Sequence, residues 1–309
     1  MDSSIIIRTV APILLLMGIG YFSRRFGVLK AGDERVFSAY VYYFALPALF
    51  IVALAETSFT AQNLMFALAG ILPILIATAM FILLYFILRF SKNTLYLLIL
   101  STVFGSLTFF GIPFVTFAFP DQVNLATLSA ASISIVSVSI SITVLEVYKL
   151  EKSTISEGAK RVAKRLSRNP LVISILIGVL LSVAKIEIPA PISSSLHTLG
   201  DTTAAVAIFM LGVFLYGRKY INLGTAVKLS LLRILLLPSI GVLIAWWFNV
   251  FDVQRAVLIV MQGVPIAISM IVLSERYDFY KETIASLILI SSLLAGIYLN
   301  LWLLLLGMG

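Results

Sequence analysis

The stretch "FFGIPF", from Phe109 to Phe114, places a Gly-x-Pro triplet inside a long apolar run, and "MQGVPI", from Met261 to Ile266, does the same in a second run. Proline lacks a backbone N–H and clashes with the carbonyl four residues earlier, whereas glycine permits the backbone angles that a kink needs. Both triplets therefore predict an interruption in a segment that otherwise has the composition of a helix.

The composition indicates an integral membrane protein. Of the 309 residues, 61% are hydrophobic and 12% are charged, and the mean hydropathy is +1.10. The chain therefore has too little polar surface to cover a soluble globule. It contains no cysteine, which excludes disulfides and thiolate metal sites, and we expect no metal site. The net charge of +8 comes from Lys and Arg in short loops between apolar runs, so we expect contact with the lipid bilayer and no nucleic-acid partner.

The apolar runs predict ten transmembrane helices, because a bilayer core about 30 Å thick needs roughly 20 apolar residues of helix. The predicted spans are Ile5–Phe22, Val36–Ala55, Leu64–Leu88, Leu95–Phe119, Leu125–Val147, Pro170–Ala184, Leu196–Tyr216, Ala226–Phe248, Ala256–Leu273 and Thr283–Leu306. The two Gly-x-Pro triplets lie in the fourth and ninth of these spans. We therefore expect a multi-pass protein of the cell membrane.

The charges in the connections predict the orientation of the chain. Lys and Arg are concentrated in the odd-numbered connections, including the run from Lys149 to Arg168, whereas the even-numbered connections contain only Lys185 and Arg255. Cationic loops stay in the cytoplasm, so both termini are expected to be extracytoplasmic. The acidic residue Asp2 near the N-terminus agrees with this orientation.

The one substantial connection divides the spans into two sets of five. We expect residues 1–149 to form a first five-helix repeat, residues 150–169 a basic cytoplasmic loop, and residues 170–309 a second five-helix repeat. Because five is odd, a related second repeat must cross the membrane upside down relative to the first. The predicted fold is therefore all-α, with two inverted repeats and with broken, crossing fourth and ninth helices.

The broken helices predict a substrate site near the middle of the membrane. After each break a second half-helix starts, and its free N–H groups and positive dipole end favour an anion. No Lys or Arg lies near the midplane of the fourth or ninth span, so we expect the anion to be held without a fixed cation, whereas the freed carbonyls equally suit Na⁺. The candidate substrate-binding residues are Ser106, Thr108, Gly111, Ile112, Pro113, Gln262, Gly263, Val264 and Pro265.

Three ionisable residues in the spans need separate interpretations. Asp201 lies about two turns inside the outer boundary of the seventh span, and His197, the only histidine, precedes it by four residues on the same helical face. This pair is a candidate for coupling or gating, because histidine titrates near neutral pH; a helix cap or hydrogen-bonding role is the alternative for Asp201. Arg233 is expected to reach the cytoplasmic face as an anchor.

Several segments resemble, in the same order along nearly the whole chain, the auxin efflux carrier family of plant exporters and bacterial organic-acid permeases. They are "YYFALPALF", "SLTFFGIPF", "SRNPLVISILIG", "LGDTTAAVAIFMLGVFL", "LRILLLP" and "VPIAISMIVLSERYDFYKETIAS". The resemblance implies a scaffold domain and a transport domain, elevator-type movement of carboxylate anions, and commonly a homodimer. Ser106 stands where many members have an Asn that helps bind the carboxylate, and Gly70 where the plant exporters have an acidic residue.

The leading hypothesis is thus a secondary-active transporter of small organic anions, with H⁺ or Na⁺ as the coupling ion and no organic cofactor. A sodium-coupled symporter of the bile-acid type and a non-transporting membrane sensor are the alternatives. The chain has no Walker A sequence, no His-Glu-x-x-His and no paired intramembrane aspartates, so we expect no ATP-driven transport and no enzymatic activity.

The absence of native cysteine allows a direct test of orientation. With single cysteines at Asp2 and Lys164, we expect a membrane-impermeant thiol reagent to label position 2 but not position 164 in intact cells, because the basic loop is cytoplasmic. Permeabilised cells, in which both positions react, provide the control. The reverse pattern in intact cells would contradict the orientation.

Overall fold

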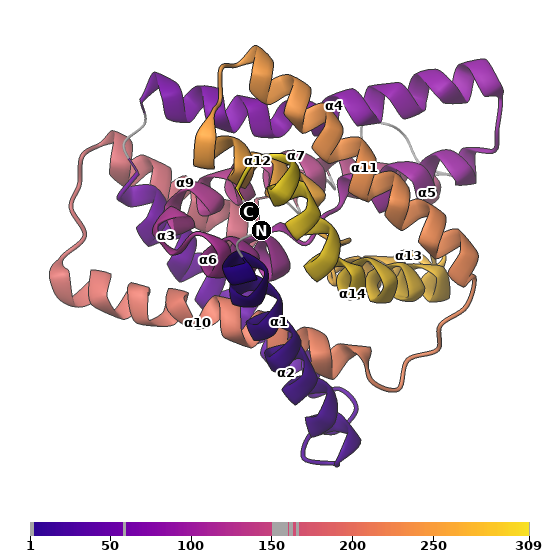
Figure 1. Ribbon diagram of the computed structural model, residues 1–309, viewed down its shortest axis with the longest axis horizontal. Coiled ribbons are helices and arrows are strands. Elements are labelled where there is room, and N and C mark those ends of the chain that lie inside the picture. Colours follow the sequence, from indigo (N-terminus) through magenta and orange to yellow (C-terminus); the bar gives the residue numbers. More distant parts are fainter. Residues whose placement is uncertain (1–2, 58–59, 150–159, 161–162, 165–166, 309) are drawn as a thin grey trace.

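The protein is described by a computed structural model that covers residues 3–57, 60–149, 160, 163–164 and 167–308 (Figure 1). Within these residues the regular secondary structure is helical, apart from one isolated β-bridge. Most of the basic loop predicted at 150–169, and the N-terminal Asp2, lie outside the described residues.

Six helical segments of the described chain are long and apolar enough to cross a membrane. They are Glu34–Ala55, Ala61–Leu88, Pro120–Lys149, Ala190–Leu215, Leu223–Trp247 and Lys281–Leu305. Each covers one of the ten predicted spans. The first predicted span falls in α1 (Ser3–Arg25) and the sixth in the shorter α9 (Pro170–Val183). The fourth and ninth are each divided into two helices.

Local chemistry explains where several of these helices begin. Thr60 and Ser91 accept hydrogen bonds from backbone N–H groups in the first turns of α4 (Ala61–Leu88) and α5 (Lys92–Val103). Asn169 does the same for α9, where Pro170 takes the first helical position. Pro73 and Pro238, in contrast, lie inside the continuous helices α4 and α11 (Leu223–Trp247). A proline in an apolar run is therefore not sufficient to interrupt a helix of this protein.

The described helices pack as two groups. The first bundle contains α1, α9, α10 (Ala190–Leu215) and the continuous segment of α2 (Glu34–Tyr40), η1 (Val41–Ala45) and α3 (Leu46–Ala55). The second bundle contains α4, α5, α7 (Val123–Lys149), α11, α12 (Asp252–Gly263), α13 (Met270–Tyr277) and α14 (Lys281–Leu305). A short segment of η2 (Leu107–Gly111), α6 (Ile112–Ala118) and η3 (Pro120–Gln122) contacts both bundles.

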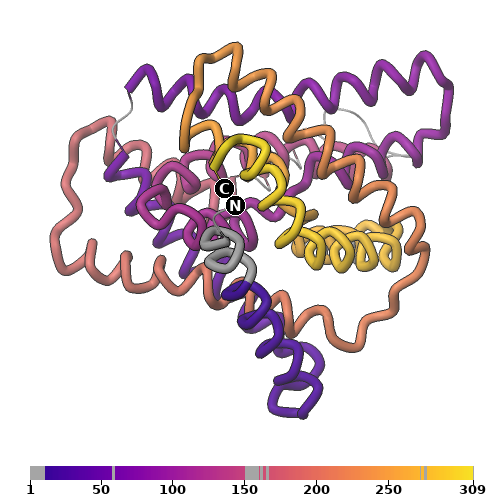
Figure 2. Tube along the Cα trace, in the orientation of Figure 1, coloured from indigo at the N-terminus to yellow at the C-terminus, as the bar shows by residue number. Residues whose placement is uncertain are grey.

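Each bundle combines helices from both halves of the sequence, and the tube in Figure 2 shows the early and late parts of the chain interleaved. In Figure 1, α4 runs along the upper edge and α10 along the lower edge. Such mixing is compatible with two intertwined repeats, although the ten-helix inverted repeat and its boundaries stay predictions.

Close backbone contact joins α1 to α10 in the first bundle. A Cβ atom added to Gly20 would collide with the Phe209 carbonyl oxygen, and one added to Gly212 would collide with the Met17 carbonyl. Small residues at such positions let membrane helices approach closely, and van der Waals contact then replaces the hydrophobic effect as the driving force. The first bundle is thus tightly packed where its two main helices cross.

Candidate functional site

The ninth span is interrupted where the sequence predicted. Helix α12 ends at Gly263, a non-helical segment follows, and α13 begins at Met270. Val264 has φ −53° and ψ 150°, an extended conformation that the following Pro265 favours, because its ring disfavours a helical residue before it. The Gly-Val-Pro triplet therefore forms the break itself.

The fourth span is also interrupted, but its Gly-Ile-Pro triplet is not the break, so that part of the sequence prediction is wrong. Helix α5 ends at Val103 and the non-helical residues are 104–106. Gly111 and Pro113 lie farther on, at the junction of η2 and α6 inside the second half-helix. There the Gly111 N–H donates to the carbonyl of Ser106, five residues back. This wider π turn accommodates Pro113 without ending the helix.

The two interruptions cross and pair with each other. Gly105 and Ile266 form an antiparallel bridge, in which the Ser106 N–H donates to the Pro265 carbonyl at 2.8 Å and the Ala267 N–H to the Phe104 carbonyl at 2.9 Å. The Ile266 N–H donates to Ser291 Oγ of α14 at 3.2 Å. These bonds satisfy unwound backbone that lipid could not.

Arg233 of α11 reaches the same crossing, and its prediction as a cytoplasmic anchor is wrong. Its side chain is only 2% exposed. Nε donates to the Val264 carbonyl at 2.6 Å, and Nη1 donates to the Thr102 carbonyl. These carbonyls belong to the C-terminal ends of α12 and α5. The guanidinium thus joins two helix ends whose dipoles are negative and therefore favour a cation.

The predicted polar residues of the site lie at or beside the crossing and are buried. Ser106 is 2% exposed, Thr108 7% and Gln262 1%. Gln262 Nε2 donates to the carbonyl of Gly70 in α4 at 2.7 Å. Among the residues that the structure describes, neither Gln262 Oε1 nor Ser106 Oγ has a hydrogen-bond partner. The glycines and apolar members of the predicted set are buried as well: Gly111, Ile112, Pro113, Gly263, Val264 and Pro265. The site is therefore closed in this conformation.

The second half-helices start beside the crossing. The π turn η2 begins at Leu107, directly after Ser106, and α13 begins at Met270. The N–H groups of Phe110 and Gly111 donate to the Ser106 carbonyl and close the first turn of this half-helix. The half-helix therefore begins with the N–H groups that precede Phe110. Both carboxyl-terminal and amino-terminal helix ends thus meet at the crossing, with Arg233 at the carboxyl-terminal ends.

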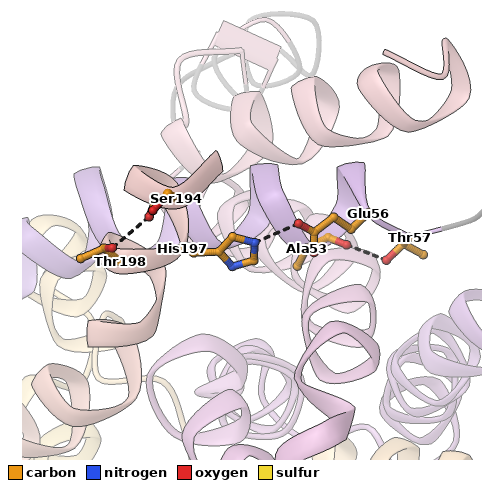
Figure 3. A network of polar contacts seen from close by, with 6 residues as sticks. All are labelled: Ala53, Glu56, Thr57, Ser194, His197 and Thr198. Carbon is orange, nitrogen blue, oxygen red and sulfur yellow. Dashed lines mark hydrogen bonds and ion pairs between the residues drawn. The ribbon is translucent and has the colours of Figure 1, made fainter. Parts of the chain in front are cut away.

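His197 and Asp201 lie away from the crossing, on the exposed surface of α10. His197 Nε2 lies 2.9 Å from Glu56 Oε1 at the end of α3, so its partner is Glu56 (Figure 3). Asp201 is exposed and has no recorded hydrogen bond or ion pair within the described part of the chain. Sequence reasoning placed both on one helical face but missed Glu56, which is 141 residues away in the chain.

Comparison with known proteins gives the class. A family model described as "Membrane transport protein" matches residues 5–303. The chain therefore belongs to this family, the auxin efflux carrier family that its motifs resemble, and the protein is a multi-pass membrane transporter.

The similar proteins cover nearly the whole chain. The "Uncharacterized transporter MJ1031" of Methanocaldococcus jannaschii is 24% identical over 95% of this chain and 96% of its own length. The "Uncharacterized transporter YfdV" of Escherichia coli K12 is 23% identical over 94% of both chains. A "Putative malonate transporter" of Rhizobium meliloti is 26% identical over 43% of this chain and 42% of its own.

The different positions of the two prolines lead to a testable difference. Pro265→Ala should lower the melting temperature of the purified protein more than Pro113→Ala does. Either change loosens the unfolded chain, at a cost of about 0.4–1 kcal/mol. Only Pro265→Ala also frees Val264 to become helical and so weakens the crossing. Thermal unfolding in detergent measures the difference, and equal shifts for the two variants would contradict the assignment.

Proposed function

We propose that the protein is a secondary-active carrier of small organic anions, carboxylates in particular. The observation that supports this most strongly is the crossing of two interrupted helices within the apolar core of a membrane transporter. Interrupted helices of this kind form substrate and ion sites in secondary transporters, because their free backbone groups can coordinate a ligand. Here the ends of the second half-helices and a buried guanidinium favour negative charge.

The energetics suit a carrier that must release its cargo. A half-helix N-terminus stabilises an anion by about 0.3–2 kcal/mol, and each hydrogen bond to a charged group contributes about 1.5–3 kcal/mol. Ser106 Oγ, a buried hydroxyl without a hydrogen-bond partner in the described part of the chain, can provide one such bond. At the upper end of these ranges, two or three such interactions total about 4–8 kcal/mol, which corresponds to dissociation constants between about millimolar and micromolar before the cost of immobilising the ligand is subtracted.

The partial similarity to a "Putative malonate transporter" suggests malonate as the first compound to test. That similarity covers 43% of this chain, so it selects a chemical class, namely short carboxylates, rather than a single substrate.

Elevator-type alternating access is the mechanism that we propose for this site. The two non-helical segments of the crossing directly follow α5 and α12, and both helices pack within the second bundle. Because the candidate residues are buried here, a ligand can enter only after a rearrangement. Movement of the second bundle against the first would expose the crossing to one side of the membrane at a time.

The exposed Asp201 on α10 of the first bundle supports a partner protomer there, since a charged group in a span normally faces protein or water.

Malonate uptake into proteoliposomes tests the substrate class. We expect saturable uptake of radiolabelled malonate, competition by unlabelled malonate, and no competition by its neutral diamide at the same concentration, because the half-helix ends select charge. Protein-free liposomes provide the background. Effective competition by the diamide, or an absence of carboxylate uptake across a panel of mono- and dicarboxylates, would contradict the proposal.

A matched pair of serine variants tests the position of the site. Ser106→Ala should weaken the apparent affinity by about three- to thirtyfold, the loss expected for one hydrogen bond to an anion. Ser101→Ala is the control, since Ser101 is equally buried but its hydroxyl already donates to the Leu98 carbonyl within α5. An affinity that is unchanged in Ser106→Ala, or lowered equally in both variants, would contradict this placement.

A further inference from the structure

We propose that the Arg233 guanidinium occupies the position of a coupling cation at the crossing, so that the carrier works without sodium. Secondary transporters with broken helices coordinate Na⁺ through unwound backbone carbonyls and the C-terminal ends of half-helices. In this protein one arginine of α11 donates to carbonyls at the ends of both α5 and α12, those of Thr102 and Val264. A positive charge is therefore built into the fold at that point.

Three further carbonyls at the crossing also accept hydrogen bonds. The Val103 carbonyl accepts from the Gly105 N–H at 3.1 Å, Phe104 from Ala267, and Pro265 from Ser106. Together with the two carbonyls bound by Arg233, five carbonyls at the crossing thus accept hydrogen bonds from donors of the protein itself. A sodium ion at this point would have to displace these bonds, including two from a charged donor, which are the stronger kind.

The space for the guanidinium depends on Gly105. A Cβ atom at this position would overlap Arg233 Nη2. Gly105 also pairs with Ile266 in the bridge. Because position 105 has no side chain, the guanidinium can lie against the non-helical segment.

The charge of Arg233 also bears on the ligand. Within the described part of the chain no carboxylate lies within ion-pair distance of its guanidinium. The negative ends of α5 and α12 compensate part of the charge, and a buried cation without a full partner favours an incoming anion. This part of the inference rests on the proposed function: a carboxylate at the crossing would complete the neutralisation.

Stability measurements test the cation role independently of any substrate. At constant ionic strength, replacing choline chloride by sodium chloride should leave the melting temperature of the wild-type protein unchanged. Arg233→Ala should lower it by about 5–10 °C, because it leaves two buried carbonyls without donors. Millimolar guanidinium should restore part of this loss, whereas urea, its uncharged isostere, should not. A sodium-dependent rise in the wild-type protein, or equal effects of guanidinium and urea on the variant, would overturn the proposal.

Two further variants keep the test informative if Arg233→Ala does not fold. Gly105→Ala retains the charge but crowds Nη2, so it should lower the melting temperature without creating a response to guanidinium. Arg233→Lys retains the charge but cannot reach both carbonyls with the same geometry. Its melting temperature should therefore lie between those of the wild-type protein and Arg233→Ala. A wild-type melting temperature in both variants would contradict a specific guanidinium site.

Malonate flux separates failure of this inference from failure of the proposed function. Uptake that is equal in sodium-containing and sodium-free media supports the inference, and uptake that requires sodium overturns it while leaving carboxylate transport intact. If no carboxylate is transported, the proposed function fails, whereas the stability measurements still decide whether Arg233 holds the cation position.

Discussion

The architecture depends on satisfying unwound backbone inside a membrane. Lipid offers no hydrogen bonds, so every N–H and carbonyl freed by a break needs a partner from the protein. Here the two breaks form hydrogen bonds with each other at the Gly105–Ile266 bridge, and Arg233 donates hydrogen bonds to the carbonyls at the ends of the preceding helices. Since each element of the crossing comes from a different part of the chain, the helices that carry them must pack in one bundle. The position of α11 between α4, α12 and α14 follows from that requirement.

Charge is arranged in an order that suits anion transport. In both the fourth and the ninth span, a helix C-terminus is followed by the bridge and then by the start of a second half-helix. Arg233 neutralises the C-terminal side, where a carbonyl-lined site would otherwise attract a cation. The N-terminal side keeps its positive character, and close by lies the Ser106 hydroxyl, which has no hydrogen-bond partner among the described residues. Membership of a transporter family and this arrangement together favour an anion carrier without a bound metal ion.

Much of the fold was predictable because hydropathy and proline chemistry are local. Six long helices coincide with predicted spans, and the break at Pro265 agrees with the preference of the residue before proline for an extended conformation. The break at Phe104–Ser106 was not predictable, because "FGS" contains no proline and Pro113 is absorbed by a π turn. Arg233 was missed since depth in a span does not reveal which way a long side chain points. The clue was an arginine amid the leucines of "LSLLRILLLP". The His197–Glu56 contact joins residues too far apart in sequence to be paired by spacing.

Movement of the crossing as part of one bundle is the central claim, and distance measurements between spin labels test it most directly. Labels at Gln62 in α4 and Ser195 in α10 report on the two bundles, and labels at Gln62 and Lys228 report within the second bundle. Double electron–electron resonance in lipid nanodiscs, with and without malonate, should show a shift of several ångströms in the first distance distribution and none in the second. Identical distributions for the Gln62–Ser195 pair under both conditions, despite demonstrated malonate transport, would contradict the account.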